Sequence, residues 1–168
     1  MTGLMAGKRG LIMGVANDHS IAWGIAKALH AQGARLAFTY QGEALGRRVA
    51  PLAAKLDSDI VLPCDVEDLA SVDATFEALD ARFDGGLDFV VHAIGFSDKA
   101  QLKGRYVDVT TRENFPRTLV LSCLSFPELA HRAAALMPPA GQLLPLTYGR
   151  PTPGMPHHNL LRIAQASP

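Results

Sequence analysis

The sequence GLIMGVANDHSIAWGIAKALHAQG, residues 10–33, places a strand, a glycine-containing turn and a helix in direct succession. Residues 10–15 form an apolar run of strand length, and apolar residues then recur at helical spacing from Ile21 to Leu29. Gly33 follows this pattern and can adopt the left-handed conformation of a helix C-cap. A buried strand that leads into an amphipathic helix predicts a parallel sheet covered by helices.

The same alternation of apolar runs and helical periods continues along the chain. It predicts strands at residues 35–40, 59–63 and 87–95, and helices over residues 43–56 and 69–83. The last of these strands reads LDFVVHAIG and is apolar enough to be buried on both faces. The order of elements predicts an α/β fold with a Rossmann-like, doubly wound parallel sheet, and 168 residues suit a single domain over residues 1–168.

Prolines interrupt the helical and strand patterns after residue 110. Residues 110–137 have the composition of one long helix, but Pro116 and Pro127 lie inside it, so we expect a kink or a break there. Residues 142–148 resemble a fifth strand with Pro145 at its centre, where a ladder donor is required. We therefore expect the sheet to end after about five strands, and expect replacement of Pro116 or Pro145 to raise stability.

Charge and hydropathy exclude several classes of function. Sixteen lysines and arginines balance sixteen aspartates and glutamates, so no net field attracts nucleic acid or an anionic membrane. No apolar run approaches the roughly 18–20 residues that span a bilayer. Cys64 and Cys123 form no recognisable motif, which favours a reducing compartment. We expect a cytoplasmic protein without nucleic-acid or membrane partners.

The turn GVANDHSIAWG, residues 14–24, has the features of an anion site. Gly14 lets backbone approach a ligand closely, and the helix that follows offers free N–H groups to a phosphate. Ser20 can cap that helix while it contacts a phosphate oxygen. Glycine-containing turns also join strands to helices for structural reasons alone, and both interpretations stay open at this point.

Other candidate ligand contacts follow the next three strands. Gln41 comes after the second strand, Asp65 and Val66 after the third, and Ile94 and Gly95 after the fourth. Ligands of doubly wound sheets bind outside the carboxyl ends of the strands, where the winding direction reverses. Asp65 could accept a hydrogen bond from an adenine amino group or cap the next helix. Together these strand ends predict a dinucleotide cleft.

Five segments extend these patterns to a known family: GVANDHSIAWGIAKAL, LAFTYQGEALGRRV, DIVLPCDV, DFVVHAIGFSDK and LKGRYVDVTTRENF. They resemble the NADH-dependent enoyl-acyl-carrier-protein reductases of bacterial fatty-acid synthesis, which are divergent short-chain dehydrogenases. The resemblance is closest over residues 8–115 and continues more loosely to the end. It implies reduction of trans-2-enoyl thioesters carried on acyl carrier protein, NADH as cofactor, and a homo-oligomer.

The resemblance also implies a role for individual residues. It implies that Gly14, Ser20 and Ile21 contact the pyrophosphate of the cofactor, and that Gln41 contacts the adenosine. It further implies that Asp65 and Val66 contact the adenine, and that Ile94 and Gly95 contact the middle of the cofactor. Ser97 is expected to face the acyl substrate. The second strand ends in TYQGE, without a cation to hold a 2′-phosphate, which favours NADH over NADPH.

The catalytic positions of the family are altered in this chain. Tyr148 corresponds to an outer tyrosine of the family, while the tyrosine that donates to the thioester oxygen falls at His158 and the lysine that holds the ribose falls at Gln165. Members of the family are also about a hundred residues longer than these 168, so the resemblance identifies a truncated relative. We expect NADH binding with little or no turnover; the alternative is a fragment without nucleotide binding.

The histidines do not predict a metal site. His157 and His158 are adjacent, so on a helix their side chains diverge by about 100°, and no Cys, Asp or Glu lies nearby to complete a ligand set. His92 lies inside an apolar strand, which predicts a hydrogen-bonded core histidine. No metal is expected.

Overall fold

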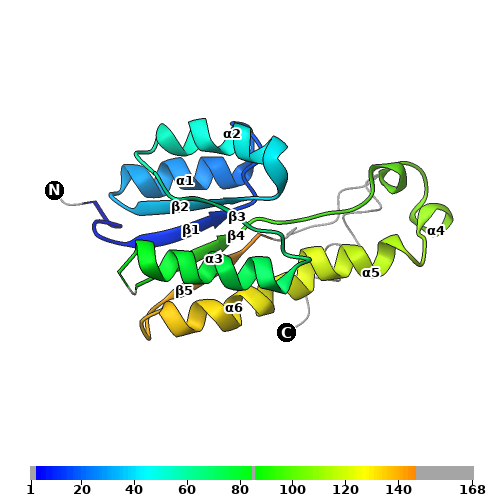
Figure 1. Cartoon of the computed structure of the whole chain (residues 1–168). Coiled ribbons are helices and arrows are strands. Elements are labelled where there is room, and N and C mark those ends of the chain that lie inside the picture. Colours follow the sequence, from blue (N-terminus) through cyan, green and yellow to red (C-terminus); the bar gives the residue numbers. More distant parts are fainter. Residues whose placement is uncertain (1–2, 85, 147–168) are drawn as a thin grey trace.

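Five parallel strands form the centre of the molecule. The computed structural model describes residues 3–84 and 86–146 (Figure 1). The sheet has the order β3-β2-β1-β4-β5 and every neighbouring pair is parallel. Its strands are β1 (Arg9–Met13), β2 (Arg35–Tyr40), β3 (Val61–Pro63), β4 (Phe89–His92) and β5 (Gln142–Pro145). The predicted parallel sheet is confirmed.

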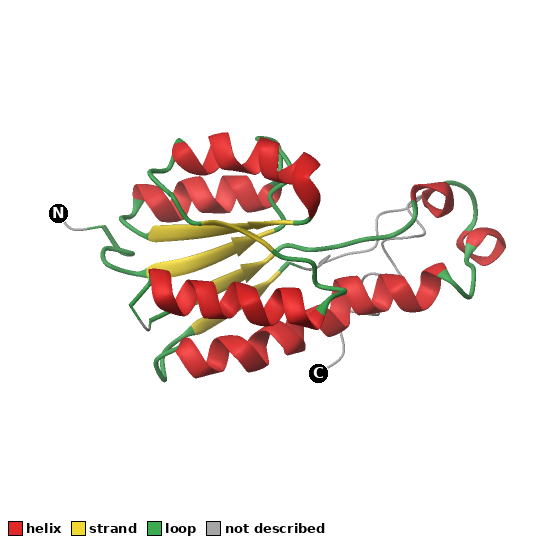
Figure 2. Cartoon of the chain, viewed as in Figure 1, coloured by secondary structure: helices red, strands yellow, loops and turns green. Residues whose placement is uncertain are grey.

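Helices cover both faces of this sheet (Figure 2). One face carries α1 (Ile21–Ala31) and α2 (Gly42–Ala54), and the other carries α3 (Leu69–Arg82) and α6 (Ser125–Leu136). From β1 the chain first adds β2 and β3 on one side, and then crosses to add β4 and β5 on the other. This reversal is the switch point of a doubly wound sheet, and it lies between β1 and β4.

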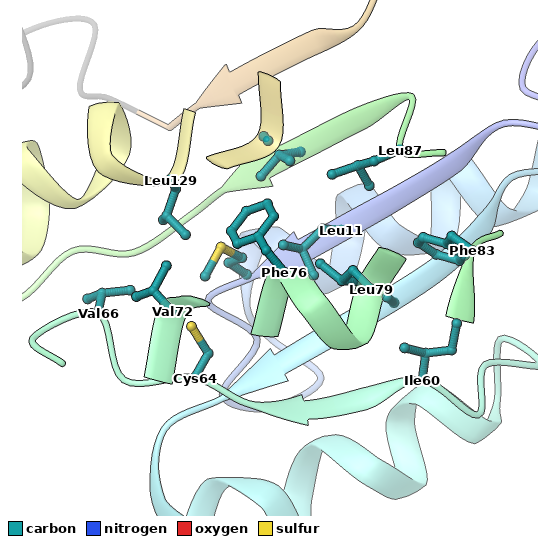
Figure 3. Close-up of a cluster of buried hydrophobic side chains, with 14 of the residues drawn as sticks. Leu11, Ile60, Cys64, Val66, Val72, Phe76, Leu79, Phe83, Leu87 and Leu129 are labelled. Carbon is teal, nitrogen blue, oxygen red and sulfur yellow. The ribbon is translucent and has the colours of Figure 1, made fainter. Parts of the chain in front are cut away.

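Alternating side chains of the central strands supply two cores. Leu11 and Met13 of β1 face the layer of α3 and α6, whereas Ile12 faces the layer of α1 and α2. Figure 3 shows the first core, where Phe76 and Leu79 of α3 pack close to Leu11. All four residues of β4 are buried, as its apolar sequence predicts.

Two glycines are required by the backbone around α1. Gly14 has φ 91°, and a Cβ there would lie 2.1 Å from the Ala93 carbonyl oxygen, so no other residue fits between β1 and β4 without movement. Gly33 has φ 93°, and its N–H donates to the His30 carbonyl at 2.8 Å while Ala34 donates to Leu29 at 3.1 Å. The predicted C-cap is confirmed.

The region between β4 and β5 is helical but interrupted. It contains a 3-10 turn (Lys99–Leu102), α4 (Tyr106–Val109), α5 (Asn114–Leu119) and a π-helical segment (Val120–Leu124) that leads into α6. The predicted interruption of the long helix is confirmed, but it falls at the π-helical segment. Pro116 lies in the first turn of α5, where an N–H has no acceptor within the helix, so its predicted cost was wrong. Pro127 is the third residue of α6, in the turn that follows the π-helical segment.

The prediction that Pro145 deletes a ladder hydrogen bond was also wrong. Gln142 N–H donates to the Asp88 carbonyl and Leu146 N–H to the His92 carbonyl, both at 2.9 Å. Because donors alternate along a strand, the Pro145 nitrogen faces the outer edge and leaves the β4–β5 ladder intact. Pro63 of β3 is oriented in the same way, since the next residue donates to Tyr40. Among the described residues, each outer strand of the sheet therefore carries a proline that removes a donor from its outer side.

Candidate functional site

A cavity of about 230 Å³ opens at the carboxyl ends of β1, β2, β3 and β4. Six of the residues assigned to a cofactor line it: Gly14, Gln41, Asp65, Val66, Ile94 and Gly95. They come from four separate strand ends, so the parallel sheet itself brings them together. The cavity lies beside the switch point between β1 and β4, where ligands bind in doubly wound sheets.

Three other predicted site residues lie outside the wall of this cavity. Ser20 and Ile21 stand at the start of α1, next to the turn that begins at Gly14, and the Ile21 side chain is 70% exposed. Ser97 follows the cavity residue Phe96 on the segment after β4. The first two remain close to a helix N-terminus, whose N–H groups lack partners within the helix.

Ser20 orders the turn and does not cap the helix with its side chain. Its hydroxyl accepts from the backbone N–H groups of Ala16 at 3.0 Å and Asn17 at 3.1 Å, and no hydrogen bond joins it to the first turn of α1. The predicted side-chain cap was wrong, because the turn folds back and offers the hydroxyl two donors before the helix begins. The result is a turn whose backbone is held at both ends.

Asp65 ties two strand ends together. Its carboxylate accepts from the side-chain amide of Gln41 at 3.1 Å and from the backbone N–H of Glu67 at 3.0 Å. The helix-cap interpretation of Asp65 was wrong, since the N-cap of α3 is Asp68, which accepts from Ala70 N–H at 3.0 Å. A carboxylate and an amide therefore stand side by side at the rim of the cavity.

An ion pair that the sequence did not predict borders the same cavity. Arg117 of α5 donates from Nε and from a terminal nitrogen to the two carboxylate oxygens of Glu67, at 2.9 and 2.8 Å. The Arg117 guanidinium also lies 4.7 Å from the centre of the Phe96 ring. The hydrogen bonds from Arg117 lower the pKa of the Glu67 carboxyl below its usual range. All three residues line the cavity.

A buried amide orders the segment after β4. Asn114 donates from Nδ2 to the Ser97 hydroxyl at 3.1 Å and to the side-chain oxygen of Gln101 at 3.0 Å. Its Oδ1 accepts from the backbone N–H of Asp98 at 3.1 Å. Asn114 itself is 8% exposed. The position of Ser97 relative to the cavity is therefore set by the start of α5.

Two titratable groups close to the cavity are held neutral by burial. His92 is 1% exposed, and desolvation lowers its pKa to about 4. The Ser125 hydroxyl donates to the Leu121 carbonyl, so it accepts from His92 Nε2–H, at 2.9 Å. The prediction of a core histidine is confirmed. Burial likewise raises the pKa of the Cys64 thiol, which disfavours a nucleophilic thiolate.

Tyr148, His158 and Gln165 lie outside the described residues. Within the described ranges, no group of three or more His, Cys, Asp or Glu side chains could hold a metal ion. No helix in the same ranges is long and apolar enough to cross a membrane.

Comparison with known proteins finds a matching family and several similar relatives. Residues 14–167 match the profile of a family described as Enoyl-(Acyl carrier protein) reductase. A curated relative from Rhizobium meliloti strain 1021, enoyl-[acyl-carrier-protein] reductase [NADH] 2, is 66% identical over 167 residues, which cover 99% of this chain and 62% of the relative. A second reductase from that strain, numbered 1, is 54% identical, with 99% of this chain and 60% of the relative covered. The chain thus spans about three fifths of the length of these relatives.

Solved structures agree with the sequence matches. The crystal structure of FabI from Candidatus Liberibacter asiaticus superposes with a TM-score of 0.91 at 54% identity, covering 99% of this chain and 64% of that one. The reductase from Anaplasma phagocytophilum, solved in complex with NAD, gives a TM-score of 0.89 at 49% identity, with coverage of 99% and 63%. The chain belongs to the enoyl-(acyl carrier protein) reductase family.

Proposed function

We propose that this chain binds NADH in the cavity at the strand ends and turns over enoyl thioesters slowly or not at all. One observation carries the binding proposal: six residues assigned to the cofactor from sequence, contributed by four strand ends, line one cavity. Each of the four strand ends lies more than twenty residues from the next along the chain. Their convergence at the switch point is the arrangement that dinucleotide-binding sheets use.

The residues at the cavity fit a dinucleotide. Gly14, whose missing Cβ permits contact with Ala93, also exposes its backbone at the start of the turn that leads to α1. The N-terminus of α1, at Ser20 and Ile21, would face the pyrophosphate with the backbone N–H groups of its first turn. A volume of about 230 Å³ is below the roughly 300–1,000 Å³ of sites that enclose a whole drug-sized ligand, so the cavity suits one end of a long cofactor.

The polar rim favours the adenosine end of NADH. Asp65 would accept from the adenine amino group beside Val66, and Gln41 would reach the adenosine ribose. A 2′-phosphate at this ribose would approach the Asp65 carboxylate, and the residues directly after β2 supply no cation to offset that repulsion. We therefore propose NADH in preference to NADPH. Ile94 and Gly95 would contact the middle of the cofactor.

The substrate proposal follows the family. NADH, when bound, supplies a hydride for the reduction of a trans-2-enoyl thioester carried on acyl carrier protein, and Ser97 would face the acyl group. Low turnover follows from two sequence positions: Gln165 carries no charge where the family places a lysine, and His158 has a shorter reach than the family tyrosine. We also place the protein in the cytoplasm and expect it to form a homo-oligomer like the family.

The test of cofactor binding compares two neighbouring aspartates. Asp65→Ala removes the expected adenine contact, while the matched control Asp68→Ala removes only the α3 cap, at a cost of about 1 kcal/mol of stability. NADH and NADPH are titrated into wild type and both variants, following nicotinamide fluorescence, with far-UV circular dichroism as a check of folding. We expect tighter binding of NADH than of NADPH, and weaker NADH binding in Asp65→Ala alone. Equal binding by Asp65→Ala and wild type would contradict the proposed adenine contact.

A further inference from the structure

One cation borders the cavity. Arg117 is the only lysine or arginine among the residues that line it in the described part of the chain. It comes from α5 and reaches Glu67, which follows the end of β3. No sequence pattern predicts a role for it, and it takes no part in the cofactor contacts proposed for Gln41, Asp65 and Val66.

The guanidinium of Arg117 is held in a defined plane. Glu67 accepts two hydrogen bonds, at 2.9 and 2.8 Å, and the guanidinium carbon lies 4.7 Å from the centre of the Phe96 ring. Two parallel N–H···O contacts fix an arginine more firmly than a single contact does, because the guanidinium is planar. The Arg117 side chain still has 52% of its surface exposed, so these contacts do not bury the group. An oriented cation with accessible surface therefore lies at the wall of the cavity.

The position of Glu67 indicates which part of a ligand Arg117 would contact. Glu67 directly follows Asp65 and Val66, the residues proposed to contact adenine, and it holds Arg117 at that end of the cavity. A planar guanidinium stacks favourably on heteroaromatic rings. The carboxylate partner offsets the positive charge, which makes Arg117 better suited to a purine than to a phosphate.

We infer that Arg117 contacts the purine ring of the bound nucleotide, and that Glu67 and Phe96 act as positioning residues for its guanidinium. This inference rests on the proposed function, since it specifies how the adenosine end is recognised. It assigns to α5 a wall of the nucleotide site and makes the ion pair between Glu67 and Arg117 part of ligand recognition. The alternative role is a structural tie between α5 and the end of β3.

The experiment distinguishes ligand contact from a purely structural role by comparing Arg117 with Arg132, a second arginine that also forms an ion pair. Arg117→Met keeps a long apolar stem but removes the guanidinium, and Arg117→Lys keeps the charge but removes the plane. Arg132→Met is the control, because Arg132 of α6 pairs with Asp73 of α3 and lies away from the cavity. Dissociation constants for NADH, AMP and ADP-ribose are measured for each protein, with reduced nicotinamide mononucleotide as a ligand that lacks the purine.

We expect Arg117→Met and Arg117→Lys to raise the dissociation constants of NADH, AMP and ADP-ribose by about tenfold, a typical effect of losing one stacking partner. Binding of the purine-free mononucleotide, and all binding by Arg132→Met, should be unchanged. Full binding by Arg117→Lys would show that charge alone matters and would overturn the inference. Wild-type affinity in Arg117→Met would overturn it as well. If wild type binds none of the four ligands, the proposed function fails, and this inference fails with it.

A second variant covers the case in which Arg117→Met does not fold. Glu67→Gln keeps Arg117 and the contact with Phe96 but weakens the bidentate hold on the guanidinium. We expect it to raise the dissociation constants of the purine-containing ligands by about threefold, which is less than the effect of losing the arginine itself. The salt dependence of NADH binding should not increase, because the arginine is retained. Unchanged affinity for AMP in a folded Glu67→Gln protein would contradict the positioning role.

Discussion

Burial of His92 makes the stability of this protein depend on pH in a defined window. Its pKa is lowered from 6.5 to about 4, chiefly by desolvation, and the side chain is 1% exposed. At 1.36 kcal/mol per pKa unit, this difference corresponds to about 3 kcal/mol of unfolding free energy. The unfolded chain binds the additional proton between pH 6.5 and 4. The contribution is therefore fully present above pH 6.5 and is lost as the pH falls toward 4.

The assay is urea unfolding, followed by circular dichroism at several pH values from 7 to 4.5. Wild type should lose stability steadily across this range. In His92→Gln the amide can still donate to Ser125, so the protein should fold, but the group cannot titrate and the loss should be about 2–3 kcal/mol smaller over the same range. His131→Gln, on the exposed surface of α6, is the control and should keep the wild-type slope. A flat wild-type profile, or an unchanged slope in His92→Gln, would show that burial of His92 does not set this pH dependence.

Three further predictions concern the backbone and the altered catalytic positions. Gly14→Ala should lower the unfolding free energy by about 2 kcal/mol or more, because φ is 91° and the new Cβ would meet the Ala93 carbonyl oxygen; a neutral effect in urea unfolding would contradict this. Pro145→Thr should change stability by less than about 0.5 kcal/mol, since its nitrogen faces the outer edge, and a clear increase in the thermal midpoint would show that it does interrupt the ladder. With a crotonyl thioester, the unmodified chain should show no enoyl-dependent oxidation of NADH in an absorbance assay; clear oxidation that is lost in His158→Ala would show that His158 replaces the family tyrosine.

Local patterns predicted the doubly wound sheet well because its strands are apolar and its turns contain glycine. The predicted bounds of β2, residues 35–40, agree with the structure, and those of α3 differ by one residue. The predictions were wrong where the effect of a proline depends on the direction of its backbone nitrogen or on its exact position in a helix. The sequence places Pro145 inside a strand, but only the strand pairing shows that its nitrogen faces away from β4. Likewise, Pro116 is harmless because α5 begins just before it.

The candidate site was predictable to the extent that it consists of strand ends. A parallel sheet brings its carboxyl ends to one edge, so residues after four strands could be expected to converge. The ion pair between Arg117 and Glu67 has no such signal, because the two residues lie 50 positions apart and neither belongs to a motif. The hydrogen bonds of Ser20 and Asp65 also differ from expectation. Ser20 accepts from backbone N–H groups that precede the helix, and Asp65 accepts from Glu67 N–H before α3 begins, so neither side chain caps a helix.

The most direct test of NADH binding at the strand ends is a nuclear magnetic resonance titration of the isotopically labelled chain. Amide signals of Gly14, Gln41, Asp65 and Ile94, which line the cavity, should shift progressively as NADH is added. The signal of the Leu87 amide, which lies two residues before β4 at the opposite end of that strand, should not shift. Shifts confined to the cavity residues are the predicted result. Unchanged spectra at millimolar NADH, or shifts centred on the opposite edge of the sheet, would contradict the account.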